Sequence, residues 1–276
     1  MDISNLDGII EAALEEDMPK GDITSESVID SESVSEAHVI AKEKGVLAGI
    51  DIAENVFNKI DISLKYKKLK EDGEEFKSND KLALIKGKSR SILKGERLAL
   101  NFLQRLSGIA TLTKKYTDGL KGTNTKILDT RKTTPCLRIL EKYAVRMGGG
   151  VNHRFNLSEM VMIKDNHLRL IGSIKESIQR AKKSVGNGVK IEVETCSLDE
   201  VKEAMKYDAD IIMLDNMRPE EIKKAVDLVN GKIPLEVSGN ITLSNLREIS
   251  DIGVDFISVG SLTHSFKSID ISIELL

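Results

Sequence analysis

The chain has 276 residues, of which 40% are hydrophobic and 31% are charged, and its formal net charge is −3. This composition is ordinary for a globular protein, lacks the strongly basic character of a nucleic-acid binder, and contains no apolar run of the roughly 20 residues that a membrane helix needs. The acidic stretch 1–17 has neither the basic start nor the apolar core of a signal peptide, so we expect a cytoplasmic protein with no nucleic-acid or membrane partner.

The first 110 residues predict a separate α+β domain. A short amphipathic helix is expected around 6–14, and extended segments at 37–49, 62–70 and 81–88 are separated by turn-forming dipeptides. A longer helix follows over 94–116, because its apolar residues recur every three or four positions. No internal repeat or linker of low complexity separates this part from the rest, so we expect the two domains to pack together.

The second half of the chain alternates predicted strands with amphipathic helices. The strands are expected at 126–130, 161–165, 190–195, 210–216, 234–240 and 255–261. This spacing suits βα units in a parallel sheet, either open and doubly wound or closed into a barrel. Polar or charged residues end all six strands, which favours the barrel, because only in a barrel do ligand groups converge from every strand.

An excess of positive charge lies between Arg131 and Arg169, where eight Lys or Arg residues outnumber three acids. In a chain of net charge −3, the simplest reason is a small ligand with several negative charges, held by forked arginines and by lysines. Arg131 and Lys132 could also form a merely solvated pair. The candidate residues of this group are Thr130, Arg131, Lys132, His153, Arg154 and Lys164.

Lys164 and three acids form the next group of candidates. Lys164 ends an apolar strand, where it could bind an anion, pair with Glu192 or Glu194, or act as a Schiff-base nucleophile. Alternation along the strand predicts that Glu192 and Glu194 face the barrel axis. Glu194 and Asp215 close adjacent strands and could hold Mg²⁺ through a ligand's phosphates, or accept sugar hydroxyls. Glu192 lies deeper and could simply neutralise a buried lysine.

Two glycine-containing turns follow the last two predicted strands. Glycine lets backbone amides approach a phosphate closely, and a following helix N-terminus adds partial positive charge. Barrels often bind phosphate with the loops after their last two strands. The alternative is that both glycines only make tight turns. The candidate phosphate-binding residues are Ser238, Gly239, Asn240, Val259, Gly260 and Ser261.

The two cysteines, Cys136 and Cys196, lie far apart and have no CxxC partner. A disulfide or a structural zinc site is therefore not expected. The more ordinary expectation is that both are buried as small hydrophobic residues.

A phosphorylated sugar and a polyacid meeting in one pocket would fit these groups. The motifs LDTRKTTP, VRMGGGVNHRFNLSEM, VMIKDNH, EVET, IIMLDN, EVSGNI and VGSLTH resemble, in order, the signatures of the quinolinate phosphoribosyltransferase family. KGDITS, AKEKGVLAG and KGERLALNFLQRLSGIAT extend the resemblance upstream over nearly the whole chain. It implies transfer of phosphoribosyl from 5-phosphoribosyl-1-pyrophosphate to quinolinate with loss of carbon dioxide. The products would be nicotinate mononucleotide and pyrophosphate, in NAD biosynthesis, with Mg²⁺.

The resemblance also implies an architecture. We expect an α/β sandwich over 1–110, to which 265–276 returns, beside an incomplete (β/α) barrel over 111–264. The family forms homodimers in which an arginine of one N-terminal domain completes the partner's site, and Arg97 matches that arginine. The implied catalytic residues are Lys132, Lys164, Glu194 and Asp215.

By the same resemblance, five residues bind quinolinate and pyrophosphate: Arg131, Lys132, His153, Arg154 and Lys164. Glu194 and Asp215 lie near the ribose and metal, and the two glycine-containing turns hold the 5′-phosphate. One position departs from the family pattern: Cys136 stands where a glycine is usual. If that residue has a positive φ, Cys136 would be strained.

Three other interpretations remain open at this point. One is a barrel aldolase or synthase in which Lys164 forms a Schiff base. Another is a relative of the same fold with a different substrate, such as the molybdenum-transport-associated homologues, although those lack the joined DTRKT and IKDNH motifs. The last is a phosphosugar-binding protein without catalysis.

Overall fold

The computed structural model describes residues 4–186 and 188–276, and the chain divides into two compact units. The first unit contains the residues up to 114, together with 133–149 and 262–276. The second unit contains 115–132 and 150–261. The segment 133–149, which we expected in the barrel domain, thus belongs to the first unit, and residues 1–3 of the expected N-terminal domain lie outside the described residues.

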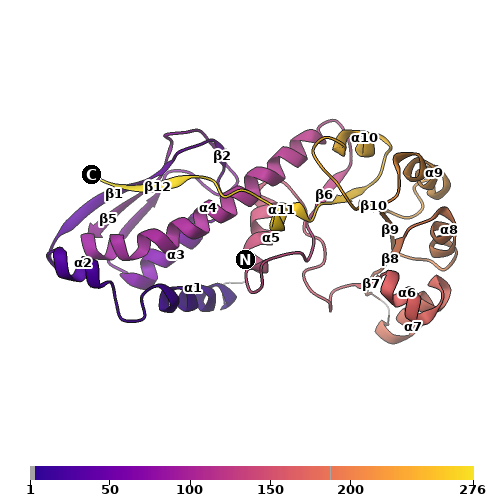
Figure 1. Ribbon diagram of the computed structural model, residues 1–276, viewed down its shortest axis with the longest axis horizontal. Coiled ribbons are helices and arrows are strands. Elements are labelled where there is room, and N and C mark those ends of the chain that lie inside the picture. Colours follow the sequence, from indigo (N-terminus) through magenta and orange to yellow (C-terminus); the bar gives the residue numbers. More distant parts are fainter. Residues whose placement is uncertain (1–3, 187) are drawn as a thin grey trace. The chain divides into compact units, whose positions relative to one another are not determined.

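The first unit contains a four-stranded antiparallel sheet in the order β12-β1-β5-β3. Figure 1 labels three of these strands, β12, β1 and β5. β12 pairs with β1 along its length, from Ala37 opposite Leu275 to Ala41 opposite Ile271. β12, the last strand in the sequence, is therefore an edge strand of this sheet, next to β1. The elements are α1 (Ser4–Asp17), α2 (Ile23–Val28), β1 (Val34–Ala41), β2 (Gly45–Val46), α3 (Ile50–Ile60), β3 (Lys65–Lys68), β4 (Glu75–Phe76), β5 (Lys81–Lys88), α4 (Ser89–Gly119), α5 (Arg138–Met147), α11 (Ser261–His264) and β12 (Ile271–Leu275).

Helix α5 is fixed within the first unit by buried polar contacts. Its Glu141, which is 0% exposed, pairs with Arg105 of α4 and accepts a hydrogen bond from the amide of Thr134 at 3.1 Å. The hydroxyl of Tyr143 donates to Asp72 at 2.6 Å, and the Asp72 carboxylate also caps the start of α3. These contacts explain why 133–149 packs with α3 and α4.

The second unit is built on a six-stranded parallel sheet in the order β6-β11-β10-β9-β8-β7. All six predicted strands are present, and the predicted helices between them are present with small shifts at their ends. Helix α6 was not predicted, because its first residues had been assigned to a strand end. The elements are β6 (Lys126–Leu128), β7 (Val161–Ile163), α6 (Asp165–Ile171), α7 (Ile174–Val185), β8 (Ile191–Thr195), α8 (Leu198–Lys206), β9 (Ile211–Asp215), α9 (Pro219–Val229), β10 (Leu235–Ser238), α10 (Leu246–Asp251) and β11 (Phe256–Ser258).

The two faces of the parallel sheet differ in chemistry. Helices α7 and α8 pack against β8 on one face, as Figure 1 shows for the row of helices α7 to α9. Val193 and Leu214 are fully buried under them. The alternate residues lie on the opposite face, here called the inner face, where Met213 is in register with both Glu194 and Glu236. The predicted assignment of Glu192 and Glu194 to the inner face agrees with this register.

The sheet forms an incomplete barrel, as expected. Within the described residues, β6 and β7 are its two edge strands, and Val151 adds one parallel bridge to Leu128 at the β6 edge. His153, on the inner face, follows Val151 by two residues. Among the described helices, none is both long and apolar enough to cross a membrane.

Candidate active site

A buried histidine with two carboxylates lies at the centre of the inner face. His153 Nε2 is 3.0 Å from Glu192 Oε2 and 3.4 Å from Glu236 Oε2. The imidazole is 9% exposed, and the two carboxylates are 0% and 1% exposed. Glu192 belongs to β8 and Glu236 to β10, with β9 between them. The two carboxylates thus reach the imidazole from strands on either side of β9.

The charges of this group depend on one another. Burial alone would lower the pKa of His153, but the hydrogen bonds to Glu192 and Glu236 outweigh burial and raise it to about 9. Burial raises the pKa of Glu192, while its hydrogen bond to His153 opposes that rise. A neutral imidazole would remove the charge that both buried carboxylates contact, although Arg154 also acts on Glu192. The imidazolium is therefore the form that this site stabilises.

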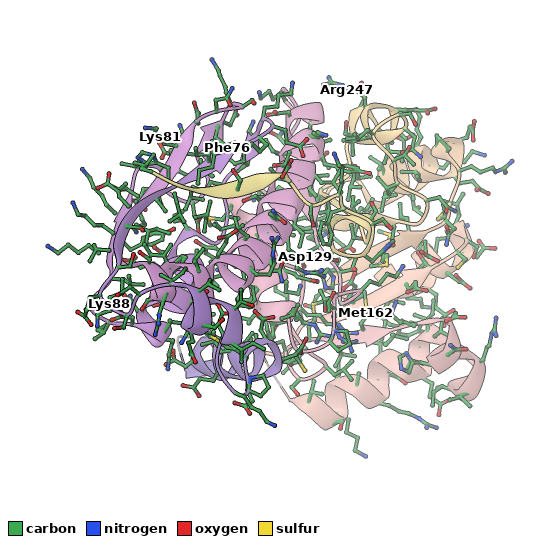
Figure 2. All side chains as sticks on the ribbon, turned by 60° about the vertical axis from the view of Figure 1, so that its left-hand side comes forward. Phe76, Lys81, Lys88, Asp129, Met162 and Arg247 are labelled. Atoms are coloured by element: carbon green, nitrogen blue, oxygen red, sulfur yellow. The ribbon has the colours of Figure 1, made fainter. Side chains whose placement is uncertain are left out.

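The backbone of His153 is fixed by Asp129, a fully buried acid next to the end of β6. The amide of His153 donates to Asp129 Oδ1 at 2.9 Å, and the side chain of Asn152 donates to Asp129 Oδ2. Figure 2 labels Asp129, and also Met162 in β7 at the other edge of the sheet. Asp129 thus sets the position of a predicted site residue, although it was not itself predicted to act there.

Of the predicted cations, Arg154 lies within electrostatic range of both Glu192 and Arg131. Arg154 is half-buried, and its guanidinium donates to the carbonyl of Met160 at 2.8 Å. Burial, followed by the nearby positive charge of Arg131, lowers the pKa of Arg154 below its ordinary value. Two arginines held within electrostatic range of each other form a site that favours an anion between or beside them. Thr130 Oγ1 accepts from the amide of Lys132 at 3.1 Å, which defines the turn after β6.

Lys164 forms an ion pair with Glu194, one of the alternatives considered from the sequence. Its Nζ lies 2.5 Å from Glu194 Oε2, with side chains 42% and 11% exposed respectively. Glu192, in contrast, pairs with a histidine and not with the buried lysine that we had considered. The Nζ atom that a Schiff base would use is thus bound to the Glu194 carboxylate.

Asp215 ends β9 beside the turn that follows β10. Its Oδ2 accepts a hydrogen bond from Asn216 Nδ2 at 2.8 Å, and Asn216 Oδ1 accepts from Asn240 Nδ2 at 3.2 Å. Gly239 has a φ of 99°, and a Cβ placed there would lie 2.2 Å from Asn216 Oδ1. The glycine is therefore required both by its backbone conformation and by close approach.

The second predicted phosphate-binding turn, 259–261, differs from the turn 238–240 in its backbone hydrogen bonds. The amide of Val259 donates to the carbonyl of Leu128 at 2.9 Å, so any role of Val259 in phosphate binding would not use that amide proton. Ser261 begins α11, which has four residues, while α10 begins only at Leu246. The amide of Leu246 donates to the carbonyl of Thr242 at 3.1 Å, and the contribution of this helix N-terminus to phosphate binding stays a prediction.

Two expectations about the cysteines have different outcomes. Both Cys136 and Cys196 are exposed, so the prediction that they are buried is wrong. Cys136 has a φ of 64°, which places a side chain with a Cβ in the left-handed region. The strain anticipated for this position is thus present. Arg97 lies on α4 in the first unit, where its side chain is exposed.

Some of these residues were not predicted to act at the site. Glu236 and Asp129 were not assigned any function, and Asn216 was noted only as part of a strand end. A charged residue at an alternate position of an otherwise apolar strand was the one available signal for Glu236. The partnership of Glu236 with His153 depends on how distant segments fold together, which the sequence does not reveal.

Comparison with known proteins identifies the family. The model for the N-terminal domain of quinolinate phosphoribosyl transferase matches residues 22–107, and the model for its C-terminal domain matches residues 109–274. A probable nicotinate-nucleotide pyrophosphorylase (carboxylating) of Bacillus subtilis (strain 168) is 44% identical over 260 residues, covering 94% of this chain and 90% of that protein. Quinolinate phosphoribosyltransferase (decarboxylating) 1b of Nicotiana tabacum is 41% identical over 290 residues, covering 98% and 82%.

A solved structure agrees with these sequence relatives. The crystal structure of NadC from Streptococcus pyogenes superposes with a TM-score of 0.97 at 42% identity, covering 100% of this chain and 98% of that one. Both family models and both sequence relatives extend over the two units described above. The chain belongs to the quinolinate phosphoribosyltransferase family.

Proposed function

We propose that this protein transfers the phosphoribosyl group of 5-phosphoribosyl-1-pyrophosphate to quinolinate and releases pyrophosphate and carbon dioxide, leaving nicotinate mononucleotide. The observation that carries the proposal is the inner-face arrangement in the second unit. There, the buried side chain of His153 pairs with Glu192 and Glu236, and Arg131 and Arg154 lie within electrostatic range of each other. Glu194 and Asp215 belong to adjacent strands of the sheet. A dicarboxylate and a phosphorylated sugar are the two ligands that these groups suit.

The cations have separate tasks in this proposal. His153, Arg131 and Arg154 bind the two carboxylates of quinolinate, because a desolvated cation pairs strongly with a carboxylate. Lys132 and Lys164 stabilise the negative charge that grows on the departing pyrophosphate. Because Lys164 is already paired with Glu194, it is held in place before the substrate arrives and needs little reorganisation.

The acids act on the sugar. Breaking the bond at ribose C1 leaves positive character on the ring, and the carboxylates of Glu194 and Asp215 stabilise it and accept hydrogen bonds from the sugar hydroxyls. The turns 238–240 and 259–261 hold the 5′-phosphate. Once the pyridine nitrogen carries ribose it becomes cationic and draws electrons from the bond to the 2-carboxylate. If quinolinate labelled in that carboxylate released carbon dioxide without the phosphoribosyl donor, this order of steps would be wrong.

We also propose that Mg²⁺ binds with the donor substrate at Glu194 and Asp215. The donor set fits, because both residues offer carboxylate oxygens on one face of adjacent strands, and Mg²⁺ favours one or two carboxylates together with substrate phosphates. Glu194 Oε2 is used by Lys164 and Asp215 Oδ2 by Asn216, which leaves the second oxygen of each for a metal. When bound, the ion would neutralise charge on the pyrophosphate.

A homodimer in which Arg97 completes the partner's site is part of the same proposal. The exposed position of Arg97 on α4 is compatible with that role. An inactive Arg97→Ala chain mixed with an inactive Lys132→Ala chain should regain partial activity, because one of the two sites in a mixed dimer would have both residues intact. No recovery in dimers verified to be mixed would argue against a shared site.

The direct test of the function is formation of nicotinate mononucleotide from quinolinate and the phosphoribosyl donor. Nicotinate serves as the control substrate, because it lacks the 2-carboxylate and should not be used. Borohydride treatment during turnover tests the Schiff-base alternative. The proposal predicts no adduct on Lys164, and a trapped adduct there would favour an aldolase or synthase.

A further inference from the structure

Asn216 joins two parts of the site that come from different strands. It follows the last residue of β9, and its side-chain amide donates to Asp215 Oδ2 at 2.8 Å. Its Oδ1 accepts from Asn240 Nδ2 at 3.2 Å, and its backbone amide donates to the carbonyl of Ser238 at 2.9 Å. One residue thus bonds the acid at the end of β9 and both ends of the turn after β10.

The turn after β10 packs directly on Asn216. A Cβ at Gly239 would meet Asn216 Oδ1 at 2.2 Å, Cγ at 2.5 Å and the backbone nitrogen at 3.0 Å. Contacts at these distances allow only glycine at position 239 unless Asn216 moves. The conformation of the turn and the orientation of the Asn216 side chain therefore depend on each other.

We propose that Asn216 is a positioning residue that couples the sugar-binding carboxylate of Asp215 to the phosphate-binding turn 238–240. This inference rests on the proposed function, in which Asp215 binds the ribose and the turn 238–240 binds the 5′-phosphate of the same phosphoribosyl group. The amide suits the task since it donates on one side and accepts on the other. Its hydrogen bond to Asp215 also directs one carboxylate oxygen away from the sugar and leaves the other available.

The rival explanation is purely local. Asn216 has a φ of 53°, and asparagine is one of the few residues with a side chain that tolerate this region. On that view the residue is asparagine only because the backbone turns there. A glycine at this position separates the two explanations, because it accepts the backbone conformation and removes both side-chain hydrogen bonds.

The experiment measures binding of ribose 5-phosphate by calorimetry, without added divalent metal, to the full-length wild-type protein, Asn216→Gly and Asn230→Gly. Asn230 is the matched control, because it is an exposed asparagine with a φ of 47° at the end of α9. We expect Asn216→Gly to bind roughly tenfold more weakly, the size that follows from losing two hydrogen bonds, one of them to a carboxylate. We expect Asn230→Gly to bind as the wild type does.

Steady-state kinetics give a second readout. Asn216→Gly should raise KM for the phosphoribosyl donor by a similar factor and leave KM for quinolinate unchanged. The side-chain hydrogen bonds of Asn216 go to Asp215 and Asn240, and not to the residues of the histidine site. Equal affinity of Asn216→Gly and wild type for ribose 5-phosphate would overturn the coupling. A rise in both KM values without a loss of ribose 5-phosphate binding would overturn it as well.

A double-variant comparison tests the link itself. Adding Asn240→Gly to Asn216→Gly should weaken ribose 5-phosphate binding less than Asn240→Gly does alone, because the bond between the two asparagines is already lost. Fully additive losses would overturn the coupling. Failure of the proposed function is distinguishable from both outcomes, because it would appear as a wild-type protein that neither binds ribose 5-phosphate nor forms nicotinate mononucleotide.

Discussion

Replacing Glu236 by glutamine should lower the pKa of His153 and make substrate binding sensitive to pH. The variant keeps the size of the side chain and removes one of the two carboxylates that raise the pKa of His153 from 6.5 to about 9. If the two carboxylates contribute comparably, the pKa should fall by about one unit, which corresponds to roughly 1.4 kcal/mol of lost interaction with the imidazolium.

The consequence for binding follows from the protonated fraction. With a pKa of about 9, about 90% of His153 is charged at pH 8, whereas with a pKa near 8 about half is charged. At pH 6.5 both proteins carry the imidazolium. KM for quinolinate in Glu236→Gln should therefore match wild type at pH 6.5, exceed it about twofold at pH 8, and exceed it roughly fivefold at pH 9.

The assay is NMR titration of the histidine side chains, followed by kinetics at the three pH values. The chain has four histidines, so His153 can be assigned by substitution, and the other three serve as internal controls that should not shift.

The raised pKa of His153 also predicts how the stability of the wild-type protein depends on pH. A pKa raised on folding stabilises the native state fully below pH 6.5, and that stabilisation is lost as the pH rises through about 9. Titration of wild-type His153 near 6.5, or an unchanged value in Glu236→Gln, would refute the reasoning.

Two further substitutions test other parts of the molecule. Arg131→Ala should weaken quinolinate binding by about 2 to 5 kcal/mol, because it removes one partner of a desolvated charge pair, and unchanged affinity by calorimetry would exclude Arg131 from the site. Cys136→Gly should raise the free energy of unfolding by about 1 kcal/mol, because glycine relieves the left-handed strain at φ 64° at some cost in chain entropy. Lower stability of Cys136→Gly in denaturant unfolding would show that the thiol makes a favourable contact outweighing the strain.

The regular part of the fold could be predicted from the sequence because its signals are local. Short apolar segments at βα spacing located all six parallel strands, and alternation within one of them placed the side chain of Glu192 on the inner face. Short elements were harder to predict. Helix α6 starts directly after β7, with Lys164 at its N-cap, so the polar residues that suggested a strand end also begin a helix.

The residues of the candidate site also differ in how far the sequence could predict them. Cations at strand ends could be found by type and position, since charge in an apolar context is visible in the sequence. The pairing of Lys164 with Glu194 was among the alternatives that the sequence offered. The pairing of His153 with Glu236 was not, because it depends on how distant segments fold together. The exposure of Cys136 and Cys196 was missed for a related reason: burial depends on what packs above a residue, and composition carries no information about that.

The pairing of β12 with β1 has a consequence for how the protein is made. The strand that completes the antiparallel sheet comes far after β1 in the sequence, so the edge of β1 that it covers stays open until residues 271–275 have been made. An uncovered strand edge is a template for association with other chains, and pairing of such distant segments is slow. Nascent chains that stall before residue 271, or that are clipped there, should therefore be the ones that aggregate and need chaperones.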